Sequence, residues 1–227
     1  MGFVLEDARS ADSSFVELIW RTHSERAGTS TSVPASNWEI VIVTFNGKTT
    51  ITARGPETKA SEAHFPTDAE FFGITFNLGS FMPHLPVRTL LDRQDVTLPE
   101  ASSNSFWLHG SAWEFPTFEN ADVFVDRLIR QGILVHDPVV GAAIQGHTPN
   151  MSIRSLQYRF LQATGLTHKT IQQIKRARSA ASLLEQGTPI SDTTFELDYF
   201  DQAHLTNSLK RFVGETPAQI AQKSTVK

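Results

Sequence analysis

The stretch from residue 199 to 214, YFDQAHLTNSLKRFVG, constrains the fold most, because it specifies a whole helix together with both of its ends. Asp201 can accept hydrogen bonds from the free N–H groups of the first helical turn, and Gly214 can end the helix. Three apolar side chains share one side, at Leu205, Leu209 and Phe212. Five amide, hydroxyl, small or cationic side chains lie on the other side, at Gln202, Ala203, Thr206, Asn207 and Lys210. These types contact base edges and phosphates, so the stretch is interpreted as the second helix of a helix-turn-helix.

An earlier stretch, SIRSLQYRFLQAT, repeats this organisation. Ser152 is a helix cap, and a short helix over 139–145 precedes it. Four apolar residues are predicted to point inward, at Ile153, Leu156, Phe160 and Leu161. Five polar or aromatic residues are left outward, at Arg154, Ser155, Gln157, Tyr158 and Arg159. A long helix over 168–186 follows, then a helix over 190–197, which together predict an all-α region of two helix-turn-helix units joined by one long helix.

The composition changes near residue 137. Residues 1–136 contain ten Lys plus Arg against seventeen Asp plus Glu, together with all four Trp and twelve of the sixteen Phe. Residues 137–227 contain ten basic against seven acidic side chains. An acidic, aromatic-rich part is thus joined to a mildly basic one. The predicted domains are 1–117, a connector or dimerisation helix over 118–136, and 137–227.

The first part has the pattern of an antiparallel sheet. Strands are predicted at 15–20, 38–45, 48–53 and 70–77, and a polar loop at 28–36. Asn46-Gly47 is the strongest short-range signal for a two-residue hairpin turn. Gly73 indicates a bulge or a close approach of another group to the backbone. The expected fold class is therefore α+β, with a small antiparallel β-barrel or sandwich before the helices.

Small barrels can enclose a ligand cavity, and aromatic side chains are its expected lining. The candidate effector-binding residues are Trp20, Trp38, Phe45, Phe65, Phe72, Phe76 and Trp107. The alternative is that these rings only fill the core. The helix predicted over 119–131 likewise has two interpretations, because its wide apolar stripe can pack on its own barrel or form a dimer contact.

Catalytic and metal chemistry receive little support from the sequence. His23, His64, His84 and His109 are dispersed and lack the His-x-His spacing of metal-binding barrels. Cysteine is absent, and neither a nucleophile elbow nor a Gly-rich phosphate loop occurs. We therefore expect no metal, no cofactor and no enzymatic activity. The N-terminal residues lack the pattern of a signal peptide, and no apolar segment has the length of a membrane span, so a cytoplasmic location without membrane contact is expected.

Three runs within residues 138–220 resemble the DNA-binding domain of AraC/XylS-type transcription regulators. They are SIRSLQYRFLQATGLT, IKRARSAASLLEQG and YFDQAHLTNSLKRFVGETPAQI. The most specific parts are the Asp-Gln-x-His-Leu run from Asp201, the Leu-Lys-Arg-Phe run from Leu209, and Gly214 with Thr216-Pro217. The first part of the chain is similar to a cupin-like amino-terminal domain of some of these regulators, through the sequences at 55–58 and 73–76.

The resemblance implies a sequence-specific regulator of double-stranded DNA with a small effector in its barrel. A possible homodimer, and contact with RNA polymerase if the protein is an activator, are further expected partners. In the first unit, Arg154, Ser155, Gln157, Tyr158 and Arg159 would contact DNA. In the second, Gln202, Ala203, Thr206 and Asn207 would face bases, and His204, Lys210 and Arg211 would lie nearer phosphates. The chain departs from the family at Asp198, where Gly is usual, and at Asn207, where Arg is common. Two alternatives stay open: a cupin-type enzyme fused to a DNA-binding domain, and an interaction module that has lost DNA binding.

Overall fold

The computed structural model describes residues 3–11, 13–32, 35–92, 96–147 and 149–224. Two compact units make up the chain. The first, here called the sheet unit, comprises Met1–Thr29, Asn37–Pro56 and His64–Thr167. The second, called the helical unit, comprises Ser30–Ser36, Glu57–Ala63 and His168–Lys227. The domain limits expected from composition, 1–117, 118–136 and 137–227, stay predictions.

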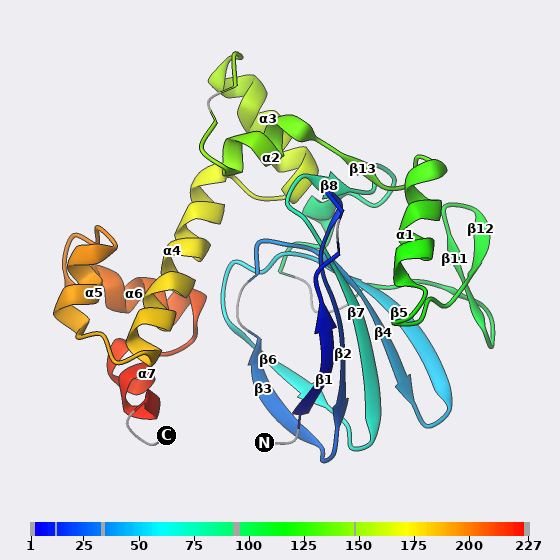
Figure 1. Ribbon diagram of the computed structural model, residues 1–227, viewed down its shortest axis with the longest axis horizontal. Helices are drawn as coiled ribbons and strands as arrows, with labels where there is room; N and C mark the ends of the chain where they lie inside the picture. The colour runs from blue at the N-terminus through cyan, green and yellow to red at the C-terminus, as the bar shows by residue number, and fades with distance from the viewer. Residues whose placement is uncertain (1–2, 12, 33–34, 93–95, 148, 225–227) are drawn as a thin grey trace. The chain divides into compact units, whose positions relative to one another are not determined.

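A six-stranded antiparallel sheet forms the framework of the sheet unit (Figure 1), with the strand order β1-β2-β7-β4-β5-β9. Its strands are β1 (Phe3–Arg9), β2 (Val16–Ser24), β4 (Glu39–Phe45), β5 (Lys48–Arg54), β7 (Ala69–Phe76) and β9 (Val96–Thr97). The predicted hairpin is confirmed, since Phe45 pairs with Lys48 across Asn46 and Gly47. Both turn residues have positive φ, 51° and 72°, as a two-residue turn of this type requires.

Within the described residues, seven shorter strands make three further sheets. They are β3 (Gly28–Ser32) with β6 (Ser61–Phe65), β8 (Ser80–Phe81) with β13 (Val135–His136), and β10 (Glu100–Ser102) with β11 (Ser105–Leu108) and β12 (Ser111–Glu114). The predicted loop over 28–36 is therefore wrong for residues 28–32, which form β3, while residues 33–34 lie outside the described residues. Residues 28–32 form a strand in spite of their polar side chains because they pair with β6, which lies about thirty residues later in the chain.

The described strands do not close into a barrel, which corrects that part of the expected fold. The sheet order ends at β1 on one side and at the two-residue β9 on the other. Its apolar face is covered by other elements instead of by closure. A sheet-rich region followed by a helical region is confirmed, whereas the cupin-like assignment has no support from the structure.

The main core lies between one face of the six-stranded sheet and helix α1 (Ala121–Arg130) with strands β11 and β12. The sheet contributes Ile19, Ile40, Ile42, Ile51, Ile74 and Phe76, and the covering elements contribute Phe106, Trp113, Phe124, Val125 and Leu128. The apolar stripe of α1 is thus buried on its own sheet, which favours the first interpretation of this helix. On the opposite face of the sheet, the Trp20 indole lies against Gly73, as the expected close approach requires.

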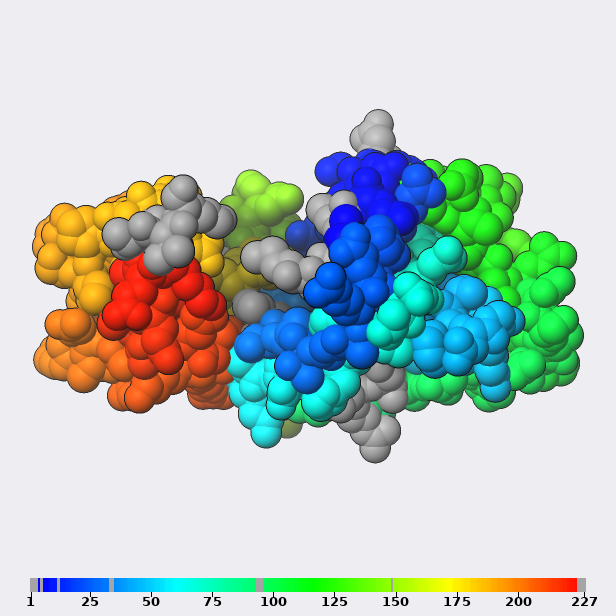
Figure 2. Space-filling model, turned by 90° about the horizontal axis from the view of Figure 1, so that it is seen from below, coloured from blue at the N-terminus to red at the C-terminus, as the bar shows by residue number. Residues whose placement is uncertain are grey.

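Six further helices are described, and those predicted at 139–145, 168–186 and 190–197 lie within one residue of the predicted limits. The six are α2 (Pro138–Ile144), α3 (Ile153–Thr164), α4 (His168–Glu185), α5 (Ile190–Glu196), α6 (Gln202–Phe212) and α7 (Pro217–Ser224). Helices α2 and α3 belong to the sheet unit, and α4 to α7 form the helical unit. Within the helical unit, α7 (red in Figure 2) packs on the long helix α4. None of the described helices combines the length and apolar character needed to cross a membrane.

Candidate functional site

Helix α6 is built as its sequence predicts. The side chain of Asp201 accepts a hydrogen bond from the backbone N–H of His204 at 2.7 Å, which caps the first turn. Leu205 and Leu209 are completely buried and Phe212 nearly so. These residues recur at intervals of three and four and therefore lie on one side of the helix. Burial of that side leaves the other side in solvent.

The exposed side of α6 carries the polar set expected to contact DNA. Gln202, Ala203, His204, Asn207, Lys210 and Arg211 are exposed, and Thr206 is half-buried. The Thr206 hydroxyl donates to the backbone carbonyl of Gln202 at 2.8 Å. Among the described residues, Lys210 has no ion-pair partner. The helix therefore presents an amide pair, a small side chain and a cation together, a combination that can contact both bases and phosphates.

The turn before α6 contains Asp198 at the position where Gly is usual. Its φ is 53°, in the left-handed region where glycine is favoured and where Asp is better tolerated than most residues. The carbonyl of Asp198 accepts a hydrogen bond from Arg176 at 3.5 Å, and the Arg176 guanidinium lies 4.4 Å from the centre of the Tyr199 ring. The turn thus keeps its backbone conformation without glycine, with α4 in contact with it.

Two of the predicted contact residues on α6 already have partners within the helical unit. The His204 imidazole accepts from the backbone N–H of Phe200 at 3.4 Å and packs edge-on against the buried Tyr199. Arg211 Nε donates to the carbonyl of Thr58 at 3.3 Å, and its own carbonyl accepts from Ala60 N–H at 2.9 Å. Both side chains are exposed, yet each would have to leave a partner in order to reach a phosphate.

Helix α3 is capped by Ser152, whose hydroxyl oxygen accepts from Ser155 N–H at 3.1 Å, and it ends at Gly165 with φ 69°. Phe160 is buried as predicted, and Leu156 is half-buried. The predicted inward orientation of Ile153 and Leu161 is wrong, since they are 77% and 42% exposed. Both lie at four-residue intervals from Gln157, so they share the exposed side of the helix with it.

The outward face of α3 has different surroundings from that of α6. Helix α3 packs against β8 and against the short 3-10 helix η1 (Val87–Thr89), both within the sheet unit. Phe81 of β8 forms one wall of a groove whose other residues come mainly from α3, namely Asp137, Arg154, Ser155, Tyr158, Arg159 and Gln162. The predicted contact residues of the first helix-turn-helix are thus exposed. Most of them line this groove, which Phe81 of β8 borders.

Arg159 is held by a carboxylate next to this groove. Its Nη1 lies 3.0 Å and 2.8 Å from the two carboxylate oxygens of Asp137. Asp137 also caps α2, because Oδ1 accepts from the N–H groups of Val139 and Val140. One side chain therefore joins α2 to α3 and neutralises an arginine that was expected to contact DNA.

Comparison with known proteins agrees with this geometry in the carboxy-terminal part of the chain. Residues 148–223 match a protein-family model described as a helix-turn-helix domain. The match supports a DNA-binding transcription regulator. The helix-turn-helix family concerned is the AraC type, so the expected resemblance is supported for this region. No curated protein and no solved structure matches the chain significantly.

The aromatic residues predicted to line an effector cavity are not brought together in one place. Trp38 and Phe76 are buried and stacked on each other, with ring centres 4.2 Å apart. Trp20 projects from the other face of the sheet, where its Nε1 donates to the Thr75 hydroxyl at 3.3 Å. Phe45 and Trp107 are exposed, and Phe65 is half-buried next to Gly28. Of the seven predicted residues, Phe72 lines the pocket described next.

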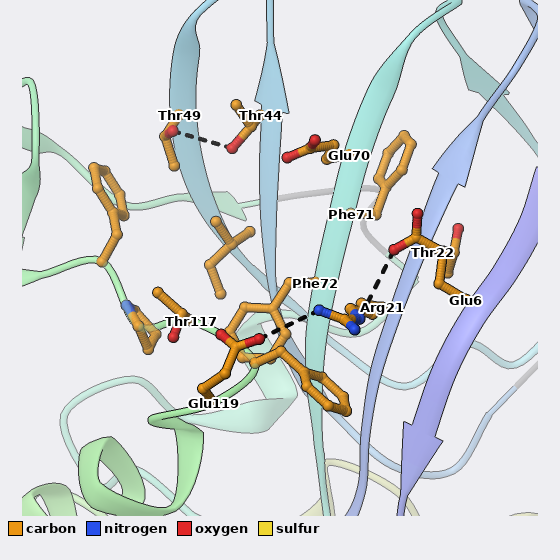
Figure 3. A pocket seen from close by; sticks show the side chains of 14 residues that line it. Glu6, Arg21, Thr22, Thr44, Thr49, Glu70, Phe71, Phe72, Thr117 and Glu119 are labelled. Atoms are coloured by element: carbon orange, nitrogen blue, oxygen red, sulfur yellow. Dashed lines mark hydrogen bonds and ion pairs between the residues drawn. The ribbon is translucent and has the colours of Figure 1, made fainter.

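A pocket of about 350 Å³ lies on the sheet unit, between the exposed end of one sheet face and the segment 115–119 (Figure 3). Its apolar wall is formed by Ile42, Phe72, Phe115, Pro116 and Phe118. Its polar wall is formed by Glu6, Arg21, Thr44, Thr49, Glu70 and Glu119. The volume falls within the range of small-molecule sites in proteins. Sequence reasoning did not identify the polar wall, because these six residues come from five strands and the segment before α1 and share no motif.

The charges in this pocket are unbalanced. Arg21 is paired with Glu119 at 3.3 Å, lies within 4 Å of Glu6 and Asp7, and stacks over the Phe118 ring at 4.8 Å. A backbone hydrogen bond, the Thr117 hydroxyl and Arg21 together lower the pKa of Glu119 and keep its carboxylate charged. The Glu70 carboxylate has no hydrogen-bond or ion-pair partner among the described residues. The pocket thus combines aromatic rings with an excess of negative charge.

Two of the histidines in the described residues lie close together. The His84 and His109 rings lie 4.3 Å apart, and burial together with the neighbouring His109 lowers the pKa of His84. Within the part of the chain that the structure describes, no three His, Cys, Asp or Glu side chains are close enough to hold a metal ion. His136 packs on Gly79 and Gly141 next to Ser80, and its pKa is lowered by burial.

Proposed function

We propose that this chain is a sequence-specific regulator of transcription that binds duplex DNA through α6 and α3 and responds to a small effector in the sheet unit. The observation that carries the DNA-binding part is the open polar face of α6. Its Gln202, Ala203, Thr206 and Asn207 would face base edges, while Lys210 would contact a phosphate. In the first unit, Arg154, Ser155, Gln157 and Tyr158 would contact bases or the backbone. Arg159 and Arg211 would contribute after leaving Asp137 and Thr58.

The experiment that tests DNA binding selects a preferred site from genomic fragments at two salt concentrations. A regulator retains one specific fragment, and its affinity falls steeply with salt because phosphate contacts release counterions. An interaction module that has lost DNA binding retains none. Absence of any specific fragment at the lower salt concentration would contradict the proposal.

Two substitutions on α6 then separate base contacts from phosphate contacts. Gln202→Ala should relax the preference at one base pair by about 1–3 kcal/mol, which is the usual contribution of a bidentate amide contact. Lys210→Ala should weaken binding on all sequences about equally and reduce the salt slope by about one. Equal effects of both variants on base preference would contradict these assigned roles.

The effector part of the proposal rests on the pocket of Figure 3. Aromatic faces attract cations, and the unpaired Glu70 carboxylate provides a counter-charge at the polar end. Arg21 is already paired with carboxylates and offers little to an anion. The lining therefore favours a small organic cation with an apolar body.

Three compounds with a common phenyl group test this preference: phenethylamine, 3-phenylpropanol and 3-phenylpropionate. Calorimetry on the full chain should detect binding of the amine only. Glu70→Gln should abolish it, whereas Glu25→Gln, which replaces an exposed carboxylate outside the pocket, should leave it intact. If the amine binds but changes neither DNA affinity nor transcription, the site is a ligand site without a regulatory role. If the carboxylate binds instead, the proposed effector class is wrong.

Activity as an enzyme is not part of the proposal. A bound-metal assay on the purified chain tests the commonest alternative, a cupin-type enzyme, and stoichiometric metal would favour it. Dimerisation and contact with RNA polymerase also stay predictions. Sedimentation at several concentrations tests the former, and transcription with purified polymerase tests the latter.

A further inference from the structure

Two large aromatic side chains stand in solvent on either side of the turn between α5 and α6. Phe195, near the end of α5, is 87% exposed, and Phe200, directly before the cap of α6, is 91% exposed. Tyr199 lies between them in sequence and is buried. The turn thus places one aromatic ring inside and leaves two rings outside. Exposed rings of this size in a small helical unit require an explanation.

Phe200 does not make the packing contact within the protein that is common for an apolar residue directly before a helix cap. A hydrophobic residue before a helix cap commonly packs against the fourth residue of the helix, which fixes the entry of the chain. The fourth residue of α6 is Leu205, and it is completely buried, whereas Phe200 is almost fully exposed. The Phe200 ring therefore makes no such contact. Among the described residues, the recorded hydrogen bond of Phe200 is from its backbone N–H to His204 Nδ1.

The position of Phe200 relative to the candidate DNA-binding face suggests a partner. In a helix-turn-helix, the N-terminal residues of the second helix are those that contact base edges. Phe200 precedes Gln202 and Ala203 by two and three residues, at the same end of α6. A ring at that end would enter the major groove along with the first helical turn.

The major groove presents one apolar group to such a ring, the C5-methyl group of thymine. We propose that Phe200 is a specificity-determining residue that contacts a thymine methyl group at one position of the preferred DNA site. The inference rests on the proposed DNA-binding function. Phe195 has comparable exposure but belongs to the first helix of the motif, which crosses the DNA backbone, so it is not expected to contact a base.

The test uses the full chain and the preferred site selected above, with each thymine replaced in turn by deoxyuridine, which lacks only the methyl group. One replacement should weaken wild-type binding about fourfold, the effect expected for exposing one buried methyl group. Phe200→Ala should bind the unmodified site correspondingly less well and be insensitive to that replacement. Phe200→Leu, which retains apolar contact, should keep part of the sensitivity. Phe195→Ala, the matched control, should keep all of it.

The outcomes separate this inference from the function on which it rests. If no preferred site exists, both are wrong. If a site exists but Phe200→Ala binds it like the wild type, or remains sensitive to every deoxyuridine replacement, only the thymine contact is wrong. Loss of transcription activation by Phe200→Ala with unchanged DNA binding also overturns it, because the ring would then serve a protein partner. Circular dichroism of each variant establishes that the fold is retained.

Discussion

The two helix-turn-helix segments have a similar organisation, a capped helix with a polar outward side, but different surroundings. Helix α3 packs on η1 and β8 of the sheet unit, and Phe81 borders its outward face. Helix α6 packs on α4 and α5, and its outward face is open. Each outward face carries two Lys or Arg side chains, yet Arg159 is paired with Asp137, whereas Lys210 and Arg211 have no ion-pair partner among the described residues. The two outward faces therefore differ in how many of their cations are free of a carboxylate partner, which the sequence does not show.

This difference teaches that the segments are equipped for different roles. The open face of α6 can contact DNA without a change in its own unit. The outward face of α3 borders a groove with Phe81 of β8, and its Arg159 is paired with Asp137 at the start of α2, so its contribution to DNA binding depends on those neighbours. Regulation would accordingly act more readily on the first segment than on the second.

The largest expected effect concerns the separate cores of the two segments. Phe160→Ala in α3 and Leu209→Ala in α6 should destabilise the protein by about 3–5 and 2–5 kcal/mol, because each leaves a cavity at a fully buried position. Hydrogen exchange should show lost protection in α2 and α3 for the first variant and in α4 to α7 for the second. The exposed substitutions Tyr158→Ala and Asn207→Ala serve as controls. Equal loss of protection across both units in both variants would contradict their independence.

A smaller effect is expected from a matched pair of glutamines on the two outward faces. Gln202→Ala should change base preference by about 1–3 kcal/mol, as stated above. Gln157→Ala should change it less, because the neighbouring residues of α3 border the groove with Phe81. Site selection with each variant, at one salt concentration, measures the difference. A greater effect for Gln157→Ala would show that α3 carries the base recognition.

Removal of the Asp137 charge should free Arg159, so that the first segment, like the second, has a cation available to contact DNA. Asp137→Asn keeps an oxygen to cap α2 but removes the charge that holds Arg159. DNA affinity should then rise, and the salt slope should become steeper by about 0.9, the value for one additional phosphate contact. Adding Arg159→Ala to Asp137→Asn should cancel the gain. An affinity gain that persists in the double variant would refute the explanation.

The smallest effect is expected at the turn of the second segment. Asp198 has φ 53°, and glycine adopts this conformation without a steric penalty. An L-residue in this conformation costs about 1–2 kcal/mol, and Asp less than most, so Asp198→Gly should raise the free energy of unfolding by at most about 1 kcal/mol and Asp198→Ala should lower it. Urea denaturation followed by circular dichroism measures both. No difference between the Gly and Ala variants would mean that the backbone conformation contributes nothing to stability.

Much of the helical region was predictable because its signals are local. The caps at Ser152 and Asp201, the left-handed residue at Gly165 and the apolar spacing of Leu205 and Leu209 each act within one or two turns of chain. The prediction was wrong for Ile153 and Leu161, which are exposed. An apolar side chain in a helix does not by itself show which side of that helix is packed against other elements. The Asn46-Gly47 hairpin was predictable for the same local reason.

The sheet unit was less predictable, because its pairing is non-local. Strand β7 pairs with both β2 and β4, and β3 pairs with the distant β6. A strand pattern does not show whether the edge strands β1 and β9 pair with each other, so the sequence could not reveal that the expected barrel does not close. The polar wall of the pocket is likewise assembled from separate strands and the segment before α1.

Local sequence chemistry determined that this chain has two capped helices with polar outward faces, since capping and periodicity involve residues close in the chain. Only the tertiary structure decided which of these faces is accessible. Asp137 and Arg159 are 22 residues apart, and Phe81 is farther still from α3. Contacts between residues so far apart in the sequence depend on how the whole unit packs, and a local sequence pattern does not predict that packing.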